Sequence, residues 1–270
     1  MATSDKGAPG SARSGAARSA AARSAPLQAF VLHGWDWSES SLILDLFTRG
    51  QGRVVVAARG AKKPTSSLRP VLLPFHPLQV WLAKPAGEDD EVRALRAAEW
   101  AGGPALAPAS LMSGFYLNEL VMKGLARQDP HPVLYDAYAN TLLALADGAL
   151  DEASALRAFE LTLLRELGVL PELSSVTLTT EPLREDARYA LAPESGLAPE
   201  KNGIAGRAWI GIQAALDHGS PAALREAVRP VAGALRVPLR SLVHYHLNTT
   251  QLRTRQVWLD MQRLAEPARR

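Results

Sequence analysis

The feature that most constrains this fold is a series of five short β-forming runs between Gln28 and Trp100. Turn residues such as Gly34, Gly52 and Pro74 separate these runs. The expected strands cover residues 28–33, 40–48, 52–60, 75–83 and 91–100. Several short strands at even spacing, each bounded by a turn, predict a small closed or nearly closed barrel. An acidic turn at residues 88–91 separates the last two expected strands.

The apolar pattern changes to a helical period after the sequence Gly102-Gly103-Pro104. Ser110 is suited to cap a helix, and the pattern predicts helices over residues 111–127, 132–147 and 152–167. Short loops between three such helices favour a bundle. The fold class is therefore α+β, with a barrel domain at residues 27–103 and a mainly α-helical domain at residues 104–270.

The remainder of the helical domain begins with a stretch rich in Pro, Thr, Ser and Glu at residues 171–203. A short hairpin is expected there as an insertion, pairing residues 176–180 with residues 188–191. Helical patterns then return at residues 206–218, 221–236, 238–247 and 251–264.

The first 26 residues consist almost wholly of Ala, Ser, Gly, Arg and Pro. Such a segment cannot bury enough apolar surface to offset its ordering entropy, so it is predicted to be a disordered basic leader. It lacks the bulky residues of an amphipathic transit helix and the apolar centre of a secretory signal. A solvated leader without a role and a basic tail that adds nucleic-acid affinity are both open interpretations.

Several function classes are excluded or disfavoured by what the sequence lacks. It has no cysteine, which excludes disulfides, thiol catalysis and thiolate zinc sites, and fits a reducing cytoplasm. No apolar run reaches about 18 residues, so no membrane association is expected. Phosphate-binding loops, serine-nucleophile motifs and zinc-protease motifs are also missing. His244 and His246 would diverge on a helix and are a weak metal signal. The chain is predicted not to be an enzyme and to need no cofactor.

A basic stretch from residue 49 to residue 69 contains no acidic residue, although the net charge of the chain is only +3. Cations on a barrel loop can neutralise DNA phosphates and release counterions, which dominates non-specific affinity. The alternative is an ordinary solvated loop. The candidate DNA contacts in this stretch are Arg53, Arg59, Lys62, Lys63 and Arg69.

Two tryptophans, Trp35 and Trp37, flank Asp36 just after the first expected strand. Exposed aromatic side chains on a barrel loop can stack on unpaired bases. The alternative is that one or both rings cover the end of the barrel.

The barrel region and the first helices resemble the RecO family over residues 29–168. The barrel segments that carry this resemblance are A-F-V-L-H-G-W-D-W-S-E-S-S-L-I-L-D-L-F-T, G-R-V-V-V-A-A-R-G-A-K-K and L-R-P-V-L-L-P-F-H-P-L. The helical segments are G-F-Y-L-N-E-L and R-A-F-E-L-T-L-L-R-E-L-G. The region after residue 170 is similar only loosely.

The resemblance implies an OB-fold followed by a helical domain, and a non-catalytic recombination mediator located with the nucleoid in the cytoplasm. Such a protein binds single- and double-stranded DNA, anneals strands and works with RecR. It also binds single-strand binding protein and indirectly aids RecA loading. The four-cysteine zinc site of many family members is excluded in this chain. Candidate contacts for the acidic, apolar-ended tail of single-strand binding protein are Lys123, Arg127, Arg157 and Arg165.

Two other functions compete with a DNA-annealing mediator. The chain would be a protein-interaction adaptor if its barrel were degenerate, or an unrecognised hydrolase or nuclease. Strong salt dependence of DNA binding distinguishes the mediator from the adaptor. Metal-dependent turnover of DNA would favour the enzyme.

Overall fold

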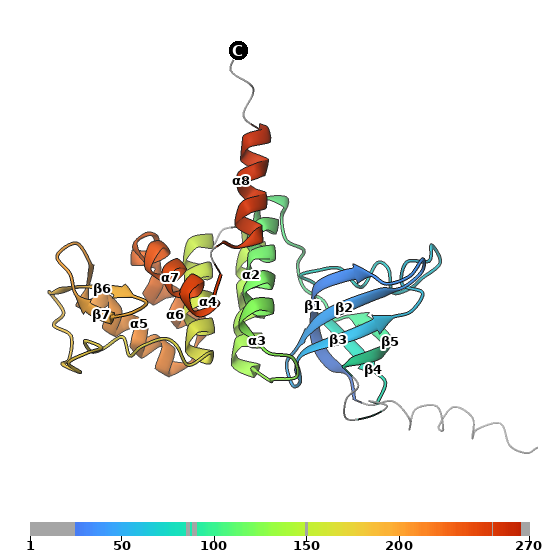
Figure 1. The fold of residues 1–270 in the computed structure, drawn as a ribbon, viewed down its shortest axis with the longest axis horizontal. Helices are drawn as coiled ribbons and strands as arrows, with labels where there is room; N and C mark the ends of the chain where they lie inside the picture. Colours follow the sequence, from blue (N-terminus) through green and yellow to red (C-terminus); the bar gives the residue numbers. More distant parts are fainter. Residues whose placement is uncertain (1–24, 85–86, 88–90, 149–150, 250, 266–270) are drawn as a thin grey trace, which may run out of the picture.

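Barrel and helices lie end to end along the longest axis of the molecule (Figure 1). The computed structural model describes residues 25–84, 87, 91–148, 151–249 and 251–265. Two expectations, disorder in the leader up to residue 24 and an acidic turn at residues 88–90, lie outside the described residues. The domain boundary at residues 103 and 104 stays a prediction.

Five strands close the barrel in the order β1-β2-β3-β5-β4. β3 and β5 run parallel, and the other neighbours run antiparallel. The pattern of short β-forming runs predicted all five strands. Their bounds are β1 (Leu27–Asp36), β2 (Leu42–Thr48), β3 (Gly52–Ala58), β4 (Leu78–Leu82) and β5 (Val92–Trp100).

Alternate side chains along the strands point into the barrel and out of it. Leu44, Leu46, Val54 and Val56 are buried in the cluster that fills the interior. The outward positions of β1 and β2 include aromatic rings instead, and Phe30 and Phe47 pair directly across these two strands. An OB-type barrel therefore presents an apolar outer face that has to be covered.

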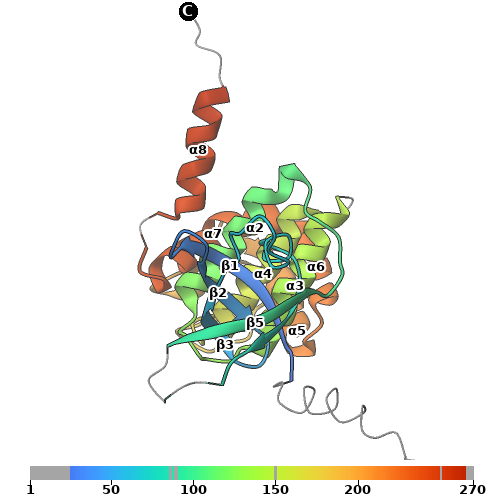
Figure 2. The ribbon, with the colours of Figure 1, turned by 90° about the vertical axis from the view of Figure 1, so that its right-hand side faces the viewer.

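The helical region covers this face (Figures 1 and 2). The fold class is as expected, an α+β chain with an N-terminal barrel followed by helices. The helices are α2 (Leu111–Gly124), α3 (Pro132–Asp147), α4 (Glu152–Glu166), α5 (Gly206–His218), α6 (Pro221–Val228), α7 (Ala232–His246) and α8 (Arg253–Ala265), with the 3-10 turns η1 (Pro108–Ser110) and η2 (Arg229–Val231).

The outer face of the barrel and the helices share one hydrophobic cluster, and the barrel interior forms a second one. Phe30 and Phe47 pack against Tyr135 and Tyr138 of α3, with ring centroids 5.0 Å apart for Phe30 and Tyr138 and 5.3 Å apart for Phe47 and Tyr135. The four rings belong to the same buried cluster as the interior of the helical region. Burial of each ring contributes roughly 1.5–3 kcal/mol, so the cluster makes folding of the barrel depend on the helices.

The expected hairpin pairing within residues 171–203 is wrong. β6 (Arg188–Ala192) pairs with β7 (Gly196–Pro199) on one side and with β8 (Ile204–Ala205) on the other. Residues 176–180 form a turn instead, in which the Thr180 N–H donates to the Val176 carbonyl over 2.8 Å. A positive φ of 65° at Gly196 allows a tight local turn, which costs less chain entropy than closing a longer loop.

The break between the late helices also differs from the expectation. The sequence predicted one helix over residues 221–236 and another from Pro238. The chain instead breaks at η2, around Pro230, and α7 continues through Pro238. Proline has no backbone N–H donor. In α7 the Ala234 carbonyl therefore lacks the hydrogen bond that residue 238 would otherwise donate within the helix.

Candidate nucleic-acid interface and partner pocket

Two turns meet at one end of the barrel and form a hollow of about 380 Å³. The Lys62 N–H donates to the Ser40 carbonyl over 2.9 Å, and the Gly60 N–H donates to the Ser41 hydroxyl over 3.3 Å. Gly60 has a φ of 71°, which lets the chain reverse direction after β3. These bonds join the turn after β1 to the turn after β3, so side chains from both turns surround the hollow.

Three predicted DNA contacts line this hollow, namely Trp37, Arg59 and Lys63. The Trp37 side chain is 54% exposed, and both cations are exposed. An aromatic face beside two cations can stack on a base while the cations contact the phosphates next to it. The serine side chains that complete the lining are neutral, so the hollow has a net positive charge.

The other predicted contacts near this end lie around the hollow. The Lys62 ammonium is 3.2 Å from the Asp36 carboxylate and donates to the Ser38 carbonyl over 3.2 Å, so it stabilises the turn after β1. The exposed Trp35 ring packs edge-on against His33, with ring centroids 4.5 Å apart. Arg69 is exposed on the loop that follows.

The expected role of Arg53 as a DNA contact is corrected by its position. Its guanidinium is buried at the junction between barrel and helices, where Nη2 lies 2.5 Å from Oδ2 of Asp45. Nη1 donates to the carbonyls of Met122 and Leu125 at the end of α2. Arg53 therefore holds the barrel against α2, and its charge is compensated by a buried carboxylate.

The four helical cations expected to bind an acidic tail do not come together. Lys123 is exposed at the end of α2, and Arg127 is 3.3 Å from Glu91, which directly precedes β5. Arg165 is 2.9 Å from Asp217 of α5. Arg157 of α4 lines a pocket between helices.

That pocket has a volume of about 590 Å³ and is formed by side chains of α2, α4, α7 and the start of α8. It combines apolar walls with an excess of positive charge, because Glu152 is the one carboxylate among its lining residues. The apolar lining includes Met112, Tyr116, Leu156, Leu252 and Trp258. The basic lining consists of Arg157, Arg236, Arg240, Arg255 and His244.

A carboxylate of α2 fixes the first turn of α8 at this pocket. Glu119 accepts hydrogen bonds from the backbone N–H groups of Arg253 and Thr254, over 2.8 and 2.9 Å, and from the Thr254 hydroxyl. A negative charge at a helix N-terminus is favourable, and the free N–H groups there need acceptors. Beyond this contact α8 projects from the body of the molecule (Figures 1 and 2).

A buried polar cluster lies beneath the pocket. The Glu160 carboxylate is fully buried, 2.7 Å from Nη2 of Arg157, and accepts a hydrogen bond of 2.5 Å from the Tyr116 hydroxyl. Burial raises the pKa of Glu160 to about 7, although Arg157, Tyr116 and Arg240 each lower it. Burial also lowers the pKa of His244, which Arg240 and Arg255 lower further.

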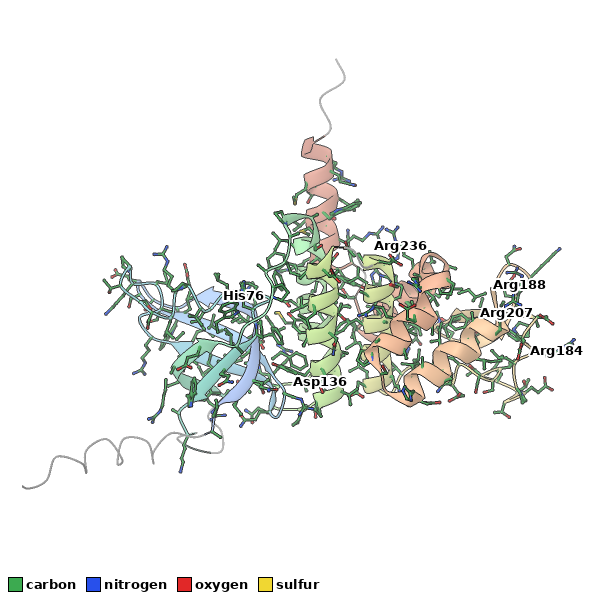
Figure 3. All side chains as sticks on the ribbon, turned by 180° about the vertical axis from the view of Figure 1, so that it is seen from behind. His76, Asp136, Arg184, Arg188, Arg207 and Arg236 are labelled. Atoms are coloured by element: carbon green, nitrogen blue, oxygen red, sulfur yellow. The ribbon has the colours of Figure 1, made fainter. Side chains whose placement is uncertain are left out.

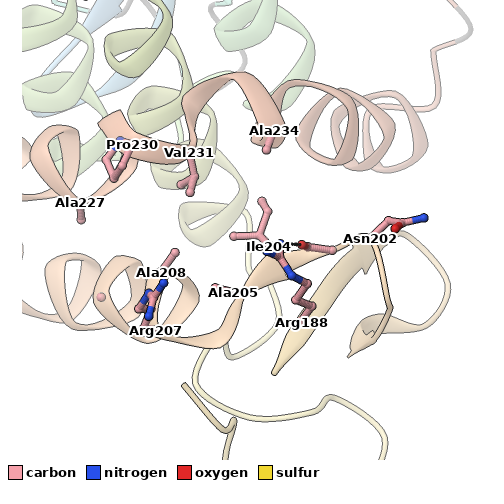
Figure 4. Close-up of a pocket in the computed structure, with 12 residues that line it drawn as sticks. Arg188, Asn202, Ile204, Ala205, Arg207, Ala208, Ala227, Pro230, Val231 and Ala234 are labelled. Carbon is pink, nitrogen blue, oxygen red and sulfur yellow. Dashed lines mark hydrogen bonds between the residues drawn. The ribbon is translucent and has the colours of Figure 1, made fainter. Parts of the chain in front are cut away.

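A further cavity of about 660 Å³ lies at the far end of the helical region (Figure 4). Small side chains such as Ala208, Ala227 and Ala234 leave it unfilled. Arg188 and Arg207 line it far from the barrel (Figure 3). This cavity is therefore separate from the hollow at the barrel end.

Comparison with known proteins decides the family. Residues 24–103 match the family model described as Recombination protein O N terminal, and residues 107–203 match Recombination protein O C terminal. The chain is 49% identical over 245 residues to DNA repair protein RecO of Polaromonas sp. (strain JS666 / ATCC BAA-500). It is 49% identical over 250 residues to DNA repair protein RecO of Variovorax paradoxus (strain S110). Each match covers 87% of this chain and 96% of the relative.

The chain belongs to the RecO family. It is thus a RecO-type DNA repair protein, and the sequence resemblance is confirmed. Among the described residues, no group of three or more His, Asp or Glu side chains is arranged to hold a metal ion. None of the described helices is long and apolar enough to cross a membrane.

Sequence reasoning missed most of the basic lining of the pocket in this RecO-family chain. Arg236 and Arg240 of α7 face Arg157 of α4, although they are far apart in the sequence. The one available signal was the excess of arginine after residue 229, which includes Arg255. The excess of arginine indicates a basic region but not its place in the fold, because the local sequence does not show which helix faces pack together.

Proposed function

We propose that this chain is a non-catalytic recombination mediator that binds single- and double-stranded DNA and anneals complementary strands. The observation that carries the proposal is the hollow where Trp37, Arg59 and Lys63 converge at the barrel end. Its cations suit the backbone of either DNA form, and its exposed ring suits an unpaired base. Little base readout is expected from such a surface, as annealing of arbitrary sequences requires.

We further propose that the pocket at Arg157 receives the acidic, apolar-ended tail of single-strand binding protein. Its arginines would pair with carboxylates, and charge-assisted bonds of this kind are stronger than neutral ones. The walls at Leu156 and Trp258 offer an apolar surface for the end of the tail. This pocket replaces the dispersed set of Lys123, Arg127 and Arg165 as the proposed site.

In this proposal the chain acts with RecR, on DNA covered by single-strand binding protein and near the nucleoid, and indirectly aids RecA loading. The relatives are DNA repair proteins, which supports a role in DNA repair, and the two surfaces support simultaneous contact with a strand and a protein tail. A pure adaptor would use only the pocket.

Single-stranded DNA binding across a range of salt concentrations tests the proposal. The double variant Arg59→Ala/Lys63→Ala should bind more weakly, with a salt slope smaller by about 1.4, because each phosphate contact on a single strand contributes about 0.7. The matched control is Arg184→Ala/Lys201→Ala, which removes the same charge from two exposed positions. Arg184 lies far from the barrel (Figure 3), and Lys201 follows β7 at the same end of the molecule (Figure 1).

If the salt slope of DNA binding fell equally in both double variants, the hollow would not be part of the DNA-binding surface. Retained binding without any salt dependence would favour the adaptor. Metal-dependent cleavage of the bound strand would contradict the non-catalytic assignment.

A further inference from the structure

Arg157 at the partner pocket is shared between the pocket and a buried carboxylate. Its side chain lines the pocket, while Nη2 lies 2.7 Å from Glu160 underneath. Within the described residues, Nε of Arg157 and Oε2 of Glu160 are buried without a hydrogen-bond partner. The ion pair between Arg157 and Glu160 therefore lacks part of its hydrogen bonding, and a charged ligand in the pocket can change the protonation of Glu160.

The groups around Glu160 come from three helices. Tyr116 of α2 donates to the carboxylate, Arg157 of α4 pairs with it, and Arg240 of α7 contributes positive charge. His244 of α7 lines the same pocket, and its Nε2 is buried without a hydrogen-bond partner in the described part of the chain. Burial raises the pKa of Glu160 to about 7, so this carboxyl can gain a proton near neutral pH, whereas burial lowers the pKa of His244, the other titratable side chain to be tested here.

A carboxylate that docks on Arg157 changes the electrostatics of Glu160. Two carboxylates would then share one guanidinium, and like charges within about 4–6 Å disfavour the charged form of each. The ligand is in water before binding and keeps its charge, whereas Glu160 is buried and burial raises its pKa to about 7. Glu160 is consequently the partner that takes the proton.

We propose that Glu160 is a positioning residue beneath the pocket, which holds Arg157 toward the ligand and takes up a proton when an acidic peptide docks. The inference rests on the proposed docking of an acidic tail at this site. It adds that docking is tighter in slightly acidic than in alkaline solution. Both the proton and the ligand bind the same state, so each must strengthen the binding of the other.

The size of the effect follows from how strongly the ligand raises the proton affinity of Glu160. A tenfold increase in that affinity would make docking about sixfold tighter at about pH 6.5 than at about pH 8.5, and would take up about half a proton near pH 7.5. Aspartate carboxylates of the ligand stay ionised over this range and contribute no opposing change.

Isothermal titration calorimetry on the full chain tests this without any substitution. The probe is a synthetic peptide of three aspartates followed by a C-terminal phenylalanine. Titration in phosphate and in Tris at one pH gives the number of protons exchanged, because the two buffers have different ionisation enthalpies. The expected result is net uptake together with rising affinity as the pH falls.

Two matched variants identify the group that takes the proton. Glu160→Gln keeps the shape of the side chain and should abolish both uptake and pH dependence, while His244→Gln should retain both. Melting curves check that each variant folds. If Glu160→Gln does not fold, uptake by the parent chain and by His244→Gln still decides the question.

The possible results separate this inference from the proposed function. Docking without proton uptake, or uptake that disappears in His244→Gln but persists in Glu160→Gln, overturns the role of Glu160 and leaves the pocket intact. No docking of the peptide at any pH overturns the partner pocket and, with it, this inference.

Discussion

Arg53 of β3 and Asp45 of β2 form an ion pair that is buried where the barrel meets α2. The same guanidinium donates to the carbonyl of Met122, in the last turn of α2, and to the carbonyl of Leu125, directly after this helix. One side chain thus compensates a buried charge and satisfies two carbonyls at a helix end. The pair belongs to the junction between barrel and helices and lies outside the proposed DNA-binding surface.

Replacing Arg53 with Ala should destabilise the fold by about 3–5 kcal/mol, because Asp45 would keep a buried charge without its partner. Urea denaturation measures this loss. The matched control is Asp136→Asn, which breaks the exposed pair between Arg49 and Asp136 and should change stability far less. Equal losses in the two variants would contradict the structural role of Arg53.

Replacing Trp37 with Ala should weaken binding of single-stranded DNA by about 1–3 kcal/mol, the typical contribution of one stacked base. Duplex binding should fall less, since paired bases are not free to stack on the ring. Fluorescence anisotropy with labelled strands provides the measurement. Trp100→Ala, at an exposed ring on β5, is the control that should bind like the parent. A uniform loss for both DNA forms would argue against stacking.

Glu160 should make the stability of the fold depend on pH. Burial raises the pKa of this carboxyl from 4.5 to about 7, so the folded chain keeps a proton that the unfolded chain releases. Stability should therefore fall as the pH rises from about 4.5 to about 7 and level off above that. The decrease is on the order of 1–3 kcal/mol and should be missing in Glu160→Gln, measured by urea denaturation at several pH values. The same slope in both proteins would be evidence that Glu160 is not the titrating group.

Replacing Glu119 with Ala should loosen α8 at its first turn. The substitution removes three hydrogen bonds to Arg253 and Thr254, and the loss of a helix cap costs about 1 kcal/mol. Limited proteolysis should then cut near residue 252 earlier than in the parent, and docking of an acidic peptide should weaken because Arg255 and Trp258 lose their position. Unchanged cleavage and docking would mean that other contacts hold α8.

The sequence predicted the elements that depend on local pattern. Strands β1 to β5 were predicted from short β-forming runs between turn residues, and helices α3, α4 and α5 were predicted from helical periodicity. The pairing of β6 with β7 and the helix break at Pro230 were not predicted. Several turn signals and two prolines are present in these segments, and tertiary packing determines which of them the chain uses.

The candidate sites likewise include residues that the local sequence indicates and residues that only tertiary packing brings together. Trp37 was named from its place on a barrel loop, and Arg59 and Lys63 were named from a basic stretch; the structure places all three around one hollow, and their contact with DNA stays a prediction. Arg53 was misassigned, since a cation in a basic stretch gives no sign that it faces a buried carboxylate on the neighbouring strand. The pocket at Arg157 joins four helices, and its composition depends on packing angles that a single sequence does not reveal.

The shared core around Phe30, Phe47, Tyr135 and Tyr138 has a consequence for how two ligands would meet. This core fixes the distance between the barrel hollow and the pocket at Arg157. A DNA strand bound in the hollow and a protein tail bound in the pocket would therefore be held at a fixed separation. Tethering replaces their bulk concentrations with an effective local concentration, and avidity then exceeds either separate affinity. A strand released by its former protein cover would thereby be recaptured before it diffuses away.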